Sequence, residues 1–353
     1  MFEELLRGWD GDEVVVRFDA SSGAWMFVGV HSTVRGPAMG GTRLKAYGSP
    51  DEALTDVLRL SAAMTLKHAA ADLPYGGGKA VLAVPVVPAR GEGERGDLLR
   101  RYAELVDSLR GTYVTAADMN TNQDDMDVIG EATSHVLGRS RDAGGSGDPA
   151  PGTAVGVFHG IVASVRRVFG SPALDDRTVL VQGIGSVGRR LTELLRDAGA
   201  RVLVSDVDGA RAEEAAAGVP GSVVAPDDVI GTECDVYAPC AMGAVLSAGS
   251  IPALRCSVVA GAANNQLATP QDADRLRETE VLYAPDYVIN AGGVIHLAGY
   301  ERLGWDEAAV AARLAGIGQT LEDVFTAADR DGITTAAAAD RLARSRLALH
   351  DGE

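Results

Sequence analysis

The sequence predicts an α/β fold in two domains, and three observations support this prediction. Short apolar runs typical of buried strands alternate with helical patterns along most of the chain. A length of 353 residues exceeds the usual size of one domain. The segment from Gly138 to Gly152 is rich in Gly, Pro, Ser and Asp without periodicity, which is typical of a connection between domains.

The first half of the chain combines strand and helix signals. Apolar residues alternate from Val14 to Phe27 around a polar turn, which predicts two antiparallel strands. A helix is expected from Pro50 to about Ala71, because Ser49 can cap its first turn. Next come a glycine-rich loop at 76–79 and a buried strand at 80–84, followed by helices at about 97–109 and 124–136 with a strand at 113–116 between them.

In the second half of the chain, strand signals alternate with helix signals. The expected elements are helices at about 153–169 and 191–195, strands at 178–181 and 202–206, and shorter signals to about 284. From Asp306 the pattern is helical to the end, broken near Gly332.

Composition excludes several classes of protein. The net charge of −17 argues against a nucleic-acid clamp, because phosphate binding requires a positive footprint. No apolar stretch approaches the ~18 residues of a membrane span, and the acidic N-terminus does not resemble a secretory signal, so we expect a cytoplasmic protein that does not contact membranes. The three cysteines, Cys234, Cys240 and Cys256, lack the spacing of a zinc site or a disulfide framework. We therefore expect no metal, and cysteines that are buried as small apolar residues.

Lysine is rare in this chain. Only Lys45, Lys67 and Lys79 are lysines among 32 basic residues, and all the others are arginines. A lysine can be tuned to lose its proton whereas an arginine stays charged, so a chain that uses arginine for general charge retains lysine where deprotonation matters.

A glycine motif indicates dinucleotide binding in the second domain. The predicted strand at 178–181 leads to Gly183, Gly185 and Gly188, a helix opens there, and the next strand ends at Asp206. This is the pattern of a Rossmann-type domain, in which the helix N-terminus holds the pyrophosphate. Asp206 would bind the adenosine ribose and repel a 2′-phosphate, which favours NAD over NADP, while Arg211 nearby argues for some tolerance of NADP. The expected cofactor-binding residues are Gly183, Ile184, Gly185, Ser186, Val187, Gly188, Asp206 and Asn264.

A second group of residues suits proton transfer. Lys67 ends a predicted helix, Lys79 follows three glycines and Asp118 follows a strand, so all three can reach one cleft. Because a carboxylate orients a lysine and a neighbouring cation eases its deprotonation, one lysine would bind a substrate carboxylate while the other acts as a base. Asp118 could equally be a helix N-cap, and Asn264 a turn amide.

Six segments then resemble one family, the glutamate/leucine/phenylalanine/valine dehydrogenases. They are Met39-Gly-Gly-Thr-Arg43, Met64-Thr-Leu-Lys67, Leu73-Pro-Tyr-Gly-Gly-Gly-Lys79, Thr115-Ala-Ala-Asp118-Met-Asn-Thr121, Ala260-Gly-Ala-Ala-Asn-Asn265 and Pro285-Asp-Tyr-Val-Ile-Asn-Ala-Gly-Gly293. The resemblance extends over nearly the whole chain and looks closest to actinobacterial phenylalanine dehydrogenases, for example at Val179–Gly183 and Ala238–Gly243.

The resemblance implies NAD-linked oxidative deamination of a hydrophobic L-amino acid by a homo-oligomer with two domains around a cleft. Residues 1–140 would form the substrate-binding and catalytic α/β domain, with helices at 330–353 returning to it, and residues 141–329 the NAD-binding domain. By resemblance Lys67 binds the substrate carboxylate, Lys79 activates the attacking water and Asp118 assists proton transfer. Asn264 would contact the substrate amino group, and Gly40 and Gly41 would line the approach.

By the same resemblance, the side-chain pocket falls on Gly41, Met64, Ala116 and Val294. Ala116 and Val294 look like leucine and valine enzymes, whereas phenylalanine enzymes tend to have less bulk at Ala116 and Ala or Leu at Val294. We therefore expect leucine, isoleucine or valine ahead of phenylalanine, because each added methyl narrows a packed pocket.

Three other functions remain open at this point. One is a phenylalanine dehydrogenase with the same mechanism. Another is a 2-hydroxy-acid dehydrogenase, for which His296 would be the candidate acid/base. The third is a nucleotide-sensing protein without catalysis, against which the retention of Lys67 and Lys79 argues.

Overall fold

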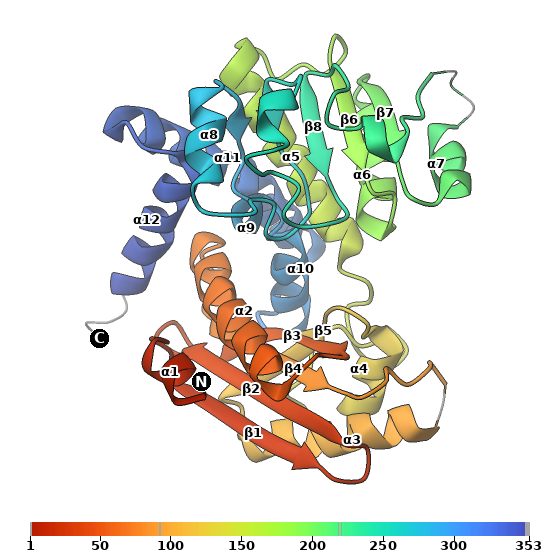
Figure 1. Ribbon diagram of the computed structural model, residues 1–353, viewed down its shortest axis with the longest axis vertical. Helices are drawn as coiled ribbons and strands as arrows, with labels where there is room; N and C mark the ends of the chain where they lie inside the picture. The colour runs from red at the N-terminus through yellow and green to blue at the C-terminus, as the bar shows by residue number, and fades with distance from the viewer. Residues whose placement is uncertain (1, 92, 218, 220, 350–353) are drawn as a thin grey trace. The chain divides into compact units, whose positions relative to one another are not determined.

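The computed structural model describes residues 2–91, 93–217, 219 and 221–349 (Figure 1). They form two compact units. The first comprises the described residues of Met1–Asp148, Tyr300–Gly304 and Ala343–Glu353, and the second those of Pro149–Gly299 and Trp305–Leu342. These limits differ from the expected 140/141 and 329/330, since the first unit extends to Asp148 and its last segment begins only at Ala343.

The first unit is built on a mixed sheet in the strand order β1-β2-β4-β3-β5. The strands are β1 (Glu13–Asp19), β2 (Ala24–Ser32), β3 (Ala38–Lys45), β4 (Gly76–Ala83) and β5 (Tyr113–Ala117). β1 pairs antiparallel with β2 and β2 with β4, while β3 pairs parallel with both β4 and β5. All of β4 is buried, so the centre of the sheet is covered on both faces.

Two features of this sheet differ from the sequence-based prediction. β3 was not predicted, because its segment has two adjacent glycines and no alternation of apolar residues. The glycines at 76–78 belong to β4 itself and not to a loop before it. Both differences arise from tertiary pairing, which overrides local propensity in sheets.

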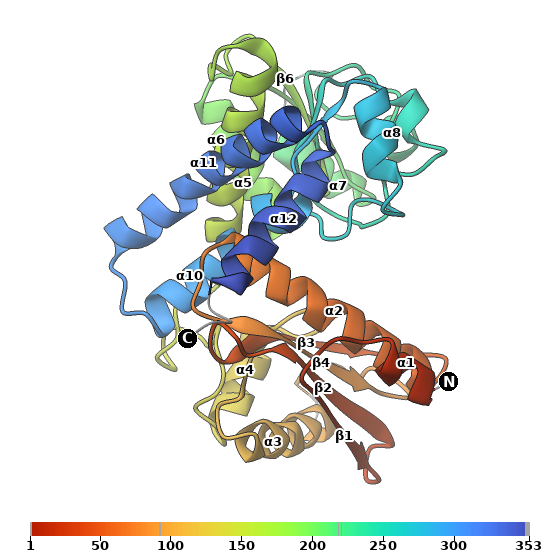
Figure 2. The same cartoon turned by 90° about the vertical axis from the view of Figure 1, so that its left-hand side faces the viewer.

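Helices cover both faces of the first sheet (Figure 2). On one face lies α2 (Pro50–Ala70), which packs on β2 and β4 through a cluster with Phe27, Leu54 and Val57. On the other face lie α3 (Gly93–Ser108) and α4 (Gln123–Gly130), whose apolar side chains join the larger core of the unit. A short helix, α1 (Phe2–Arg7), precedes β1.

α4 is shorter than the predicted helix at 124–136. It ends at Gly130, and the following residues bond to β5 instead. The N–H of Thr115 donates to the His135 carbonyl at 3.0 Å, and the N–H of Leu137 donates to the Thr115 carbonyl at 2.8 Å. Val136 thereby forms a parallel bridge beside β5.

The end of the chain is bonded into the first unit. Arg346 donates to the Ala70 carbonyl at 2.5 Å, and Arg35 donates to the Arg346 carbonyl at 2.9 Å. The returning segment is therefore fixed at the end of α2, where the helix leaves carbonyl groups without partners inside the helix.

The second unit contains a parallel sheet in the order β10-β9-β8-β6-β7. Its strands are β6 (Thr178–Gln182), β7 (Arg201–Ser205), β8 (Val236–Pro239), β9 (Val258–Val259) and β10 (Leu282–Tyr283). From β6 the chain first moves outward to β7 and then returns to β8 on the other side. This reversal creates a switch point at the carboxyl ends of β6 and β8, where open α/β sheets bind ligands.

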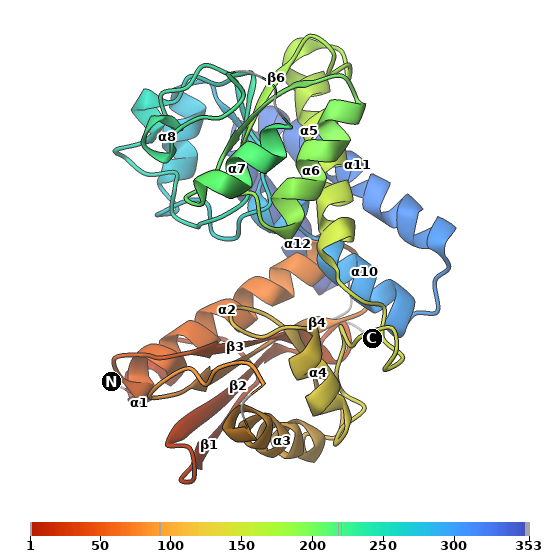
Figure 3. The ribbon, with the colours of Figure 1, turned by 90° about the vertical axis from the view of Figure 1, so that its right-hand side faces the viewer.

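Helices surround the second sheet, and Figure 3 shows α6 and α7 in green in front of it. The helices that lie wholly in the second unit are α5 (Ala150–Phe169), α6 (Ser186–Asp197), α7 (Gly209–Ala216), α8 (Asp272–Glu278), α9 (Asp286–Ile289) and α11 (Glu307–Asp331), with single 3₁₀ turns at Pro226–Asp228 and Ile251–Ala253. α10 (Gly292–Glu301) and α12 (Thr335–Ala348) begin in the second unit and end in residues of the first. α5 and α11 pack against each other, and α11 ends at Asp331, near the break that the sequence predicts. Its C-cap Gly332 is in the left-handed conformation. Among the described residues, no helix has the combined length and apolar character needed to cross a membrane.

Candidate active site

Lys67 is placed by α2, a helix whose start and position have clear causes. Ser49 caps it by accepting from the N–H of Glu52 at 3.3 Å, and Pro50 occupies its first turn. Near its C-terminal end the helix backbone lies directly on β4, because a Cβ on Gly77 would overlap the backbone and side chain of Thr65. Lys67 follows two residues later and is half-buried in the last turn of α2.

Lys79 lies on β4, two residues beyond that glycine contact. Its side chain is 6% exposed, and its Nζ lies 3.2 Å from Oδ2 of Asp118. On the neighbouring strand β2 its register partner is Gly29, which leaves the backbone of α2 room to approach. The amine is therefore a buried cation held by a carboxylate.

Asp118 immediately follows β5 and faces two cations. Besides Lys79, the Nε of Arg43 donates to its Oδ2 at 3.1 Å. Burial raises the pKa of Asp118, but the charges of Lys79 and Arg43 outweigh burial and hold the pKa at about 2. The N-cap of α4 is Asn122, which forms a capping box with Asp125, so the helix-cap alternative for Asp118 is wrong.

Gly40, Gly41 and Ala116 lie beside these charged groups on β3 and β5. Gly41 pairs with Ala116 in register, and a Cβ on Gly41 would lie 2.5 Å from the Ala117 carbonyl oxygen. The Tyr113 hydroxyl donates to the Gly40 carbonyl at 2.5 Å, which fixes the strand. Met64 is half-buried on α2. The first unit thus brings Lys79 and Asp118 into contact and places the two glycines and Ala116 on adjoining strands.

Arg43 is a member of this cluster to which sequence reasoning assigned no role. It lies on β3, two residues after Gly41, and bridges Asp118 to Asp56 of α2, with its Nη1 2.8 Å from Asp56 Oδ2. The Tyr47 hydroxyl donates to the same oxygen of Asp56 at 2.7 Å. Its place in Met39–Arg43, one of the six segments that resemble the family, is a sequence signal that could have indicated it.

The remaining two predicted residues belong to the second unit. Asn264 is exposed in the loop after β9, and its Oδ1 accepts from Nδ2 of Asn290 at 2.7 Å. Asn290 in turn donates to the Ala262 carbonyl at 3.1 Å, so the loop that carries Asn264 is braced. Val294 is half-buried in the first turn of α10. His296, the acid/base of the 2-hydroxy-acid alternative, lies on the same helix and is 8% exposed.

The nucleotide motif forms a cradle at the end of β6. Gly183 has φ +94°, and a Cβ on Gly188 would overlap the Gly183 carbonyl oxygen, so these two glycines allow the tight turn and the close approach of α6. A Cβ on Gly185, in contrast, would meet nothing within 4 Å, which leaves space for a ligand at the N-terminus of α6. Gly185 is the N-cap and provides no side-chain acceptor, so the backbone N–H groups of the first turn, with Ser186 and Val187, suit a phosphate. The residues present therefore fit a dinucleotide.

Asp206 follows β7 and closes the motif. Its Oδ2 accepts from the N–H of Ile184 at 2.7 Å, and its Oδ1 accepts from the N–H of Asp208 at 2.9 Å. Burial raises the pKa of Asp206, but these backbone hydrogen bonds outweigh burial and lower it, so the side chain is a carboxylate. Arg211 lies 3.4 Å from Asp206 and 3.4 Å from Asp208, so its charge is already balanced by two acids.

The cysteines are less uniformly buried than expected. Cys234 is buried, whereas Cys240 and Cys256 are half-buried because they lie where β8 ends and just before β9 begins. In the part of the chain that the structure describes, no three His, Cys, Asp or Glu side chains are grouped to hold a metal ion.

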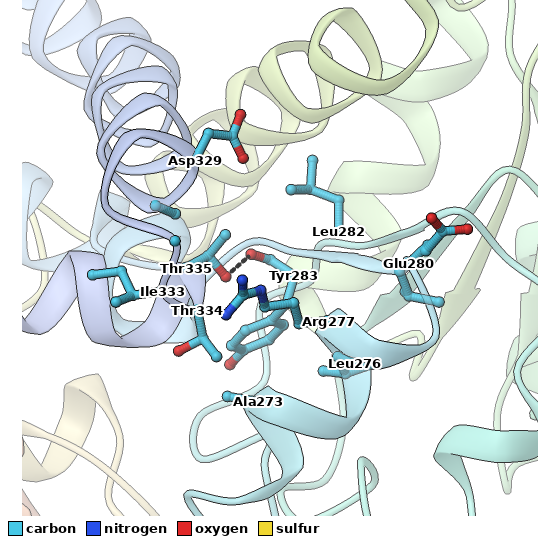
Figure 4. Close-up of a pocket in the computed structure, with 13 residues that line it drawn as sticks. Ala273, Leu276, Arg277, Glu280, Leu282, Tyr283, Asp329, Ile333, Thr334 and Thr335 are labelled. Carbon is cyan, nitrogen blue, oxygen red and sulfur yellow. Dashed lines mark hydrogen bonds between the residues drawn. The ribbon is translucent and has the colours of Figure 1, made fainter.

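The second unit also contains a cavity of about 350 Å³ between α8, β10 and the turn from α11 to α12 (Figure 4). Arg277 and Thr334 contribute polar groups to its wall, and Thr335 donates to the Tyr283 carbonyl at 2.7 Å. None of the predicted site residues lines it.

Comparison with known proteins identifies the family. Residues 16–135 match the model of the Glu/Leu/Phe/Val dehydrogenase dimerisation domain, and residues 213–350 match the model of the glutamate/leucine/phenylalanine/valine dehydrogenases. The chain belongs to this family. As a member of the Glu/Leu/Phe/Val dehydrogenases, it is an oxidoreductase that acts on amino acids.

Relatives within this dehydrogenase family carry different substrate names. The chain is 40% identical to leucine dehydrogenase of Geobacillus stearothermophilus over 98% of this chain and 92% of that protein. It is 43% identical to valine dehydrogenase of Streptomyces virginiae over 95% of this chain and 93% of that one. The crystal structure of L-tryptophan dehydrogenase from Nostoc punctiforme superposes with a TM-score of 0.84 at 38% identity and covers 100% of both chains. These relatives confirm the predicted family and the α/β fold.

Proposed function

We propose that this dehydrogenase oxidatively deaminates a hydrophobic L-amino acid with NAD, reversibly, to a 2-oxo acid, ammonium and NADH. The observation that supports this most directly is the buried contact between Lys79 and Asp118 beside the glycines of β3. The second unit provides a cradle suited to a dinucleotide, whose nicotinamide ring supplies the hydride chemistry when bound.

In this proposal the two lysines and Asp118 of the first unit have different roles. Lys67 binds the substrate carboxylate as a charged group, and Lys79 accepts the proton of the water that attacks the imine carbon. Asp118 orients the Lys79 amine, which its contact distance of 3.2 Å allows. Asn264 would contact the substrate amino group from the second unit, and its hydrogen bond from Asn290 holds the amide oxygen in place.

The proposed function is tested with a panel of 2-oxo acids, ammonium and NADH. We expect NADH oxidation that requires ammonium, with the 2-oxo acids of leucine, valine and isoleucine as the best substrates. Oxidation without ammonium would instead indicate a 2-hydroxy-acid dehydrogenase. NADH binding without any turnover would indicate a non-catalytic protein.

The preference for branched aliphatic substrates is supported by the packing around Ala116. Ala116 is 6% exposed on β5 and pairs with Gly41 in register, so a larger substrate ring would compete with its methyl group for space. We expect Ala116→Gly to raise kcat/KM for phenylalanine relative to leucine by about tenfold, since one methyl in a pocket changes selectivity by about 1–3 kcal/mol. Steady-state kinetics with leucine, valine and phenylalanine measure this change in selectivity. A native enzyme that prefers phenylalanine, or no gain in the variant, would contradict the pocket proposal.

The proposed preference for NAD depends on Asp206. We expect Asp206→Ser to raise the efficiency with NADP relative to NAD at least about tenfold, because the repelling carboxylate is removed and Arg211 becomes available to a 2′-phosphate. Asp208→Ser is the matched control, since it also removes a partner of Arg211 but keeps a residue type able to cap α7. An unchanged ratio in Asp206→Ser would show that another residue selects the cofactor.

We also propose that the protein is a homo-oligomer. The match of residues 16–135 to a domain described as a dimerisation domain supports this.

A further inference from the structure

Arg43 is placed to influence the chemistry of Lys79 without touching the reacting atoms. The Nε of Arg43 and the Nζ of Lys79 both contact one oxygen of Asp118, Oδ2, at 3.1 Å and 3.2 Å. The side chains of Arg43, Lys79 and Asp118 are 15%, 6% and 22% exposed, so water screens their charges only weakly. One carboxylate is thus shared by two neighbouring cations.

The opposite end of Arg43 is fixed by Asp56. Arg43 Nη1 contacts Asp56 Oδ2 at 2.8 Å, and the side chain of Asp56 is only 14% exposed. Asp56 is itself held on α2 by Tyr47 at 2.7 Å and by Arg59 at 2.9 Å. With both ends of its guanidinium engaged, Arg43 has a defined position, and its planar fork is suited to join two carboxylates.

We propose that Arg43 is a positioning residue that limits the negative charge which Asp118 presents to Lys79, and thereby helps the Lys79 amine to release its proton. This inference rests on the proposed role of Lys79 as the base. Without a second cation beside it, Asp118 would bind the ammonium form of Lys79 more tightly. With Arg43 present, the carboxylate still orients the amine but opposes its deprotonation less.

Other charged and titratable groups face this cluster from β2, β3 and α2. Burial raises the pKa of Asp56, but the hydrogen bond from Tyr47 and the charge of Arg43 outweigh burial and lower it, so Asp56 is a carboxylate. Burial raises the pKa of Tyr47, which therefore stays a neutral donor to Asp56. Lys45 on β3 lies 4.8 Å from the centre of the Tyr47 ring, and α2 carries Lys67 and His68. Burial lowers the pKa of His68 to about 4, and His31 of β2 contacts Thr65 of α2 through Nδ1 at 2.8 Å.

The first test is the pH dependence of kcat/KM in Arg43→Gln, Arg43→Lys and the native enzyme. Removing the Arg43 charge stabilises protonated Lys79, so the acid limb of the profile should move to higher pH by about one unit. The rate should fall about tenfold on the acid limb, and the loss should shrink as the pH rises. Arg43→Lys retains the positive charge but not the planar guanidinium, so its acid limb should lie between those of the native enzyme and Arg43→Gln.

Arg59→Gln is the matched control. It removes an arginine from the same network, but one that is 52% exposed and contacts only the far oxygen of Asp56. We expect the pH profile of kcat/KM in Arg59→Gln to match that of the native enzyme. Asp56→Asn provides a second route to the same question if Arg43→Gln does not fold. It removes the carboxylate that competes for Arg43, so Arg43 is left to Asp118 alone, and the acid limb should move in the opposite direction, to lower pH.

The second test does not need turnover. With only three lysines, protein labelled with ¹³Cε-lysine gives three lysine signals, which Lys45→Arg and Lys67→Arg variants assign. The Lys79 signal should titrate at higher pH in Arg43→Gln than in the native protein, and at the native pH in Arg59→Gln. A rate loss that is equal at all pH values, together with an unshifted Lys79 signal, would overturn the inference. Absence of ammonium-dependent turnover in the native protein, with the Lys79 signal shifted in Arg43→Gln, would overturn the proposed function and leave the charge relation standing.

Discussion

Lys79→Ala is expected to lower turnover at least about a hundredfold while NADH binds with nearly native affinity, since general-base catalysis contributes about 10²–10⁴ to the rate. The fold should tolerate the change, because Asp118 keeps its contact with Arg43 and is not left as an unpaired buried charge. NADH binding should persist because the nucleotide cradle belongs to the second unit. Single-turnover kinetics and fluorescence titration with NADH measure the two effects separately.

Lys45→Ala is the control for this prediction. Lys45 is exposed on β3, and the structure places its amine over the Tyr47 ring and not at Asp118. We expect activity within about twofold of native, since surface substitutions are usually small in effect. A Lys79→Ala enzyme with more than about a tenth of the native rate would contradict the assignment of the base.

The second large effect is expected at Gly188, in the nucleotide cradle. A methyl group there would overlap the Gly183 carbonyl oxygen, so Gly188→Ala must displace α6 from the end of β6. Such overpacking costs about 1–3 kcal/mol or more, and we expect a lower melting temperature of the nucleotide-binding unit together with weak NADH binding. Differential scanning calorimetry and NADH titration measure the two effects.

Gly185→Ala and Gly209→Ala separate stability from binding. A methyl group at either position meets nothing within 4 Å, so both variants should melt close to the native temperature. Only Gly185→Ala should weaken NADH binding, because the added methyl occupies the space where a pyrophosphate approaches. Native NADH affinity in Gly185→Ala would mean that the phosphates do not bind at this turn.

Local signals in the sequence predicted much of the fold correctly. α2 was predicted because Ser49 and Pro50 mark its start, and the strand, glycine turn and helix from β6 to α6 because a complete motif specifies them. β3 was missed because Gly40 and Gly41 carry no strand signal, and its place between β4 and β5 depends on partners distant in sequence. α4 was predicted too long for a similar reason, since hydrogen bonds with β5 take over after Gly130.

The candidate site shows the same limit. Lys79 and Asp118 could be singled out because lysine is rare and because each follows a strand or glycine signal. The role of Arg43 could not, since its contact with Asp118 joins residues 75 positions apart and the chain has 28 other arginines. Pairing of charges across a sheet depends on register, and register is set by the whole sheet and not by the residues themselves.

The contact of Thr65 with Gly77 bears on how such an enzyme can diversify. Backbone atoms set the spacing between α2 and β4 at this point, and α2 carries Lys67 while β4 carries Lys79. Met64 and Ala116, which we propose border the substrate side chain, take no part in this contact, whereas any side chain at position 77 would push the helix away. A substitution that changes the size of the proposed pocket therefore need not disturb the contact between helix and strand that positions the two proposed site lysines.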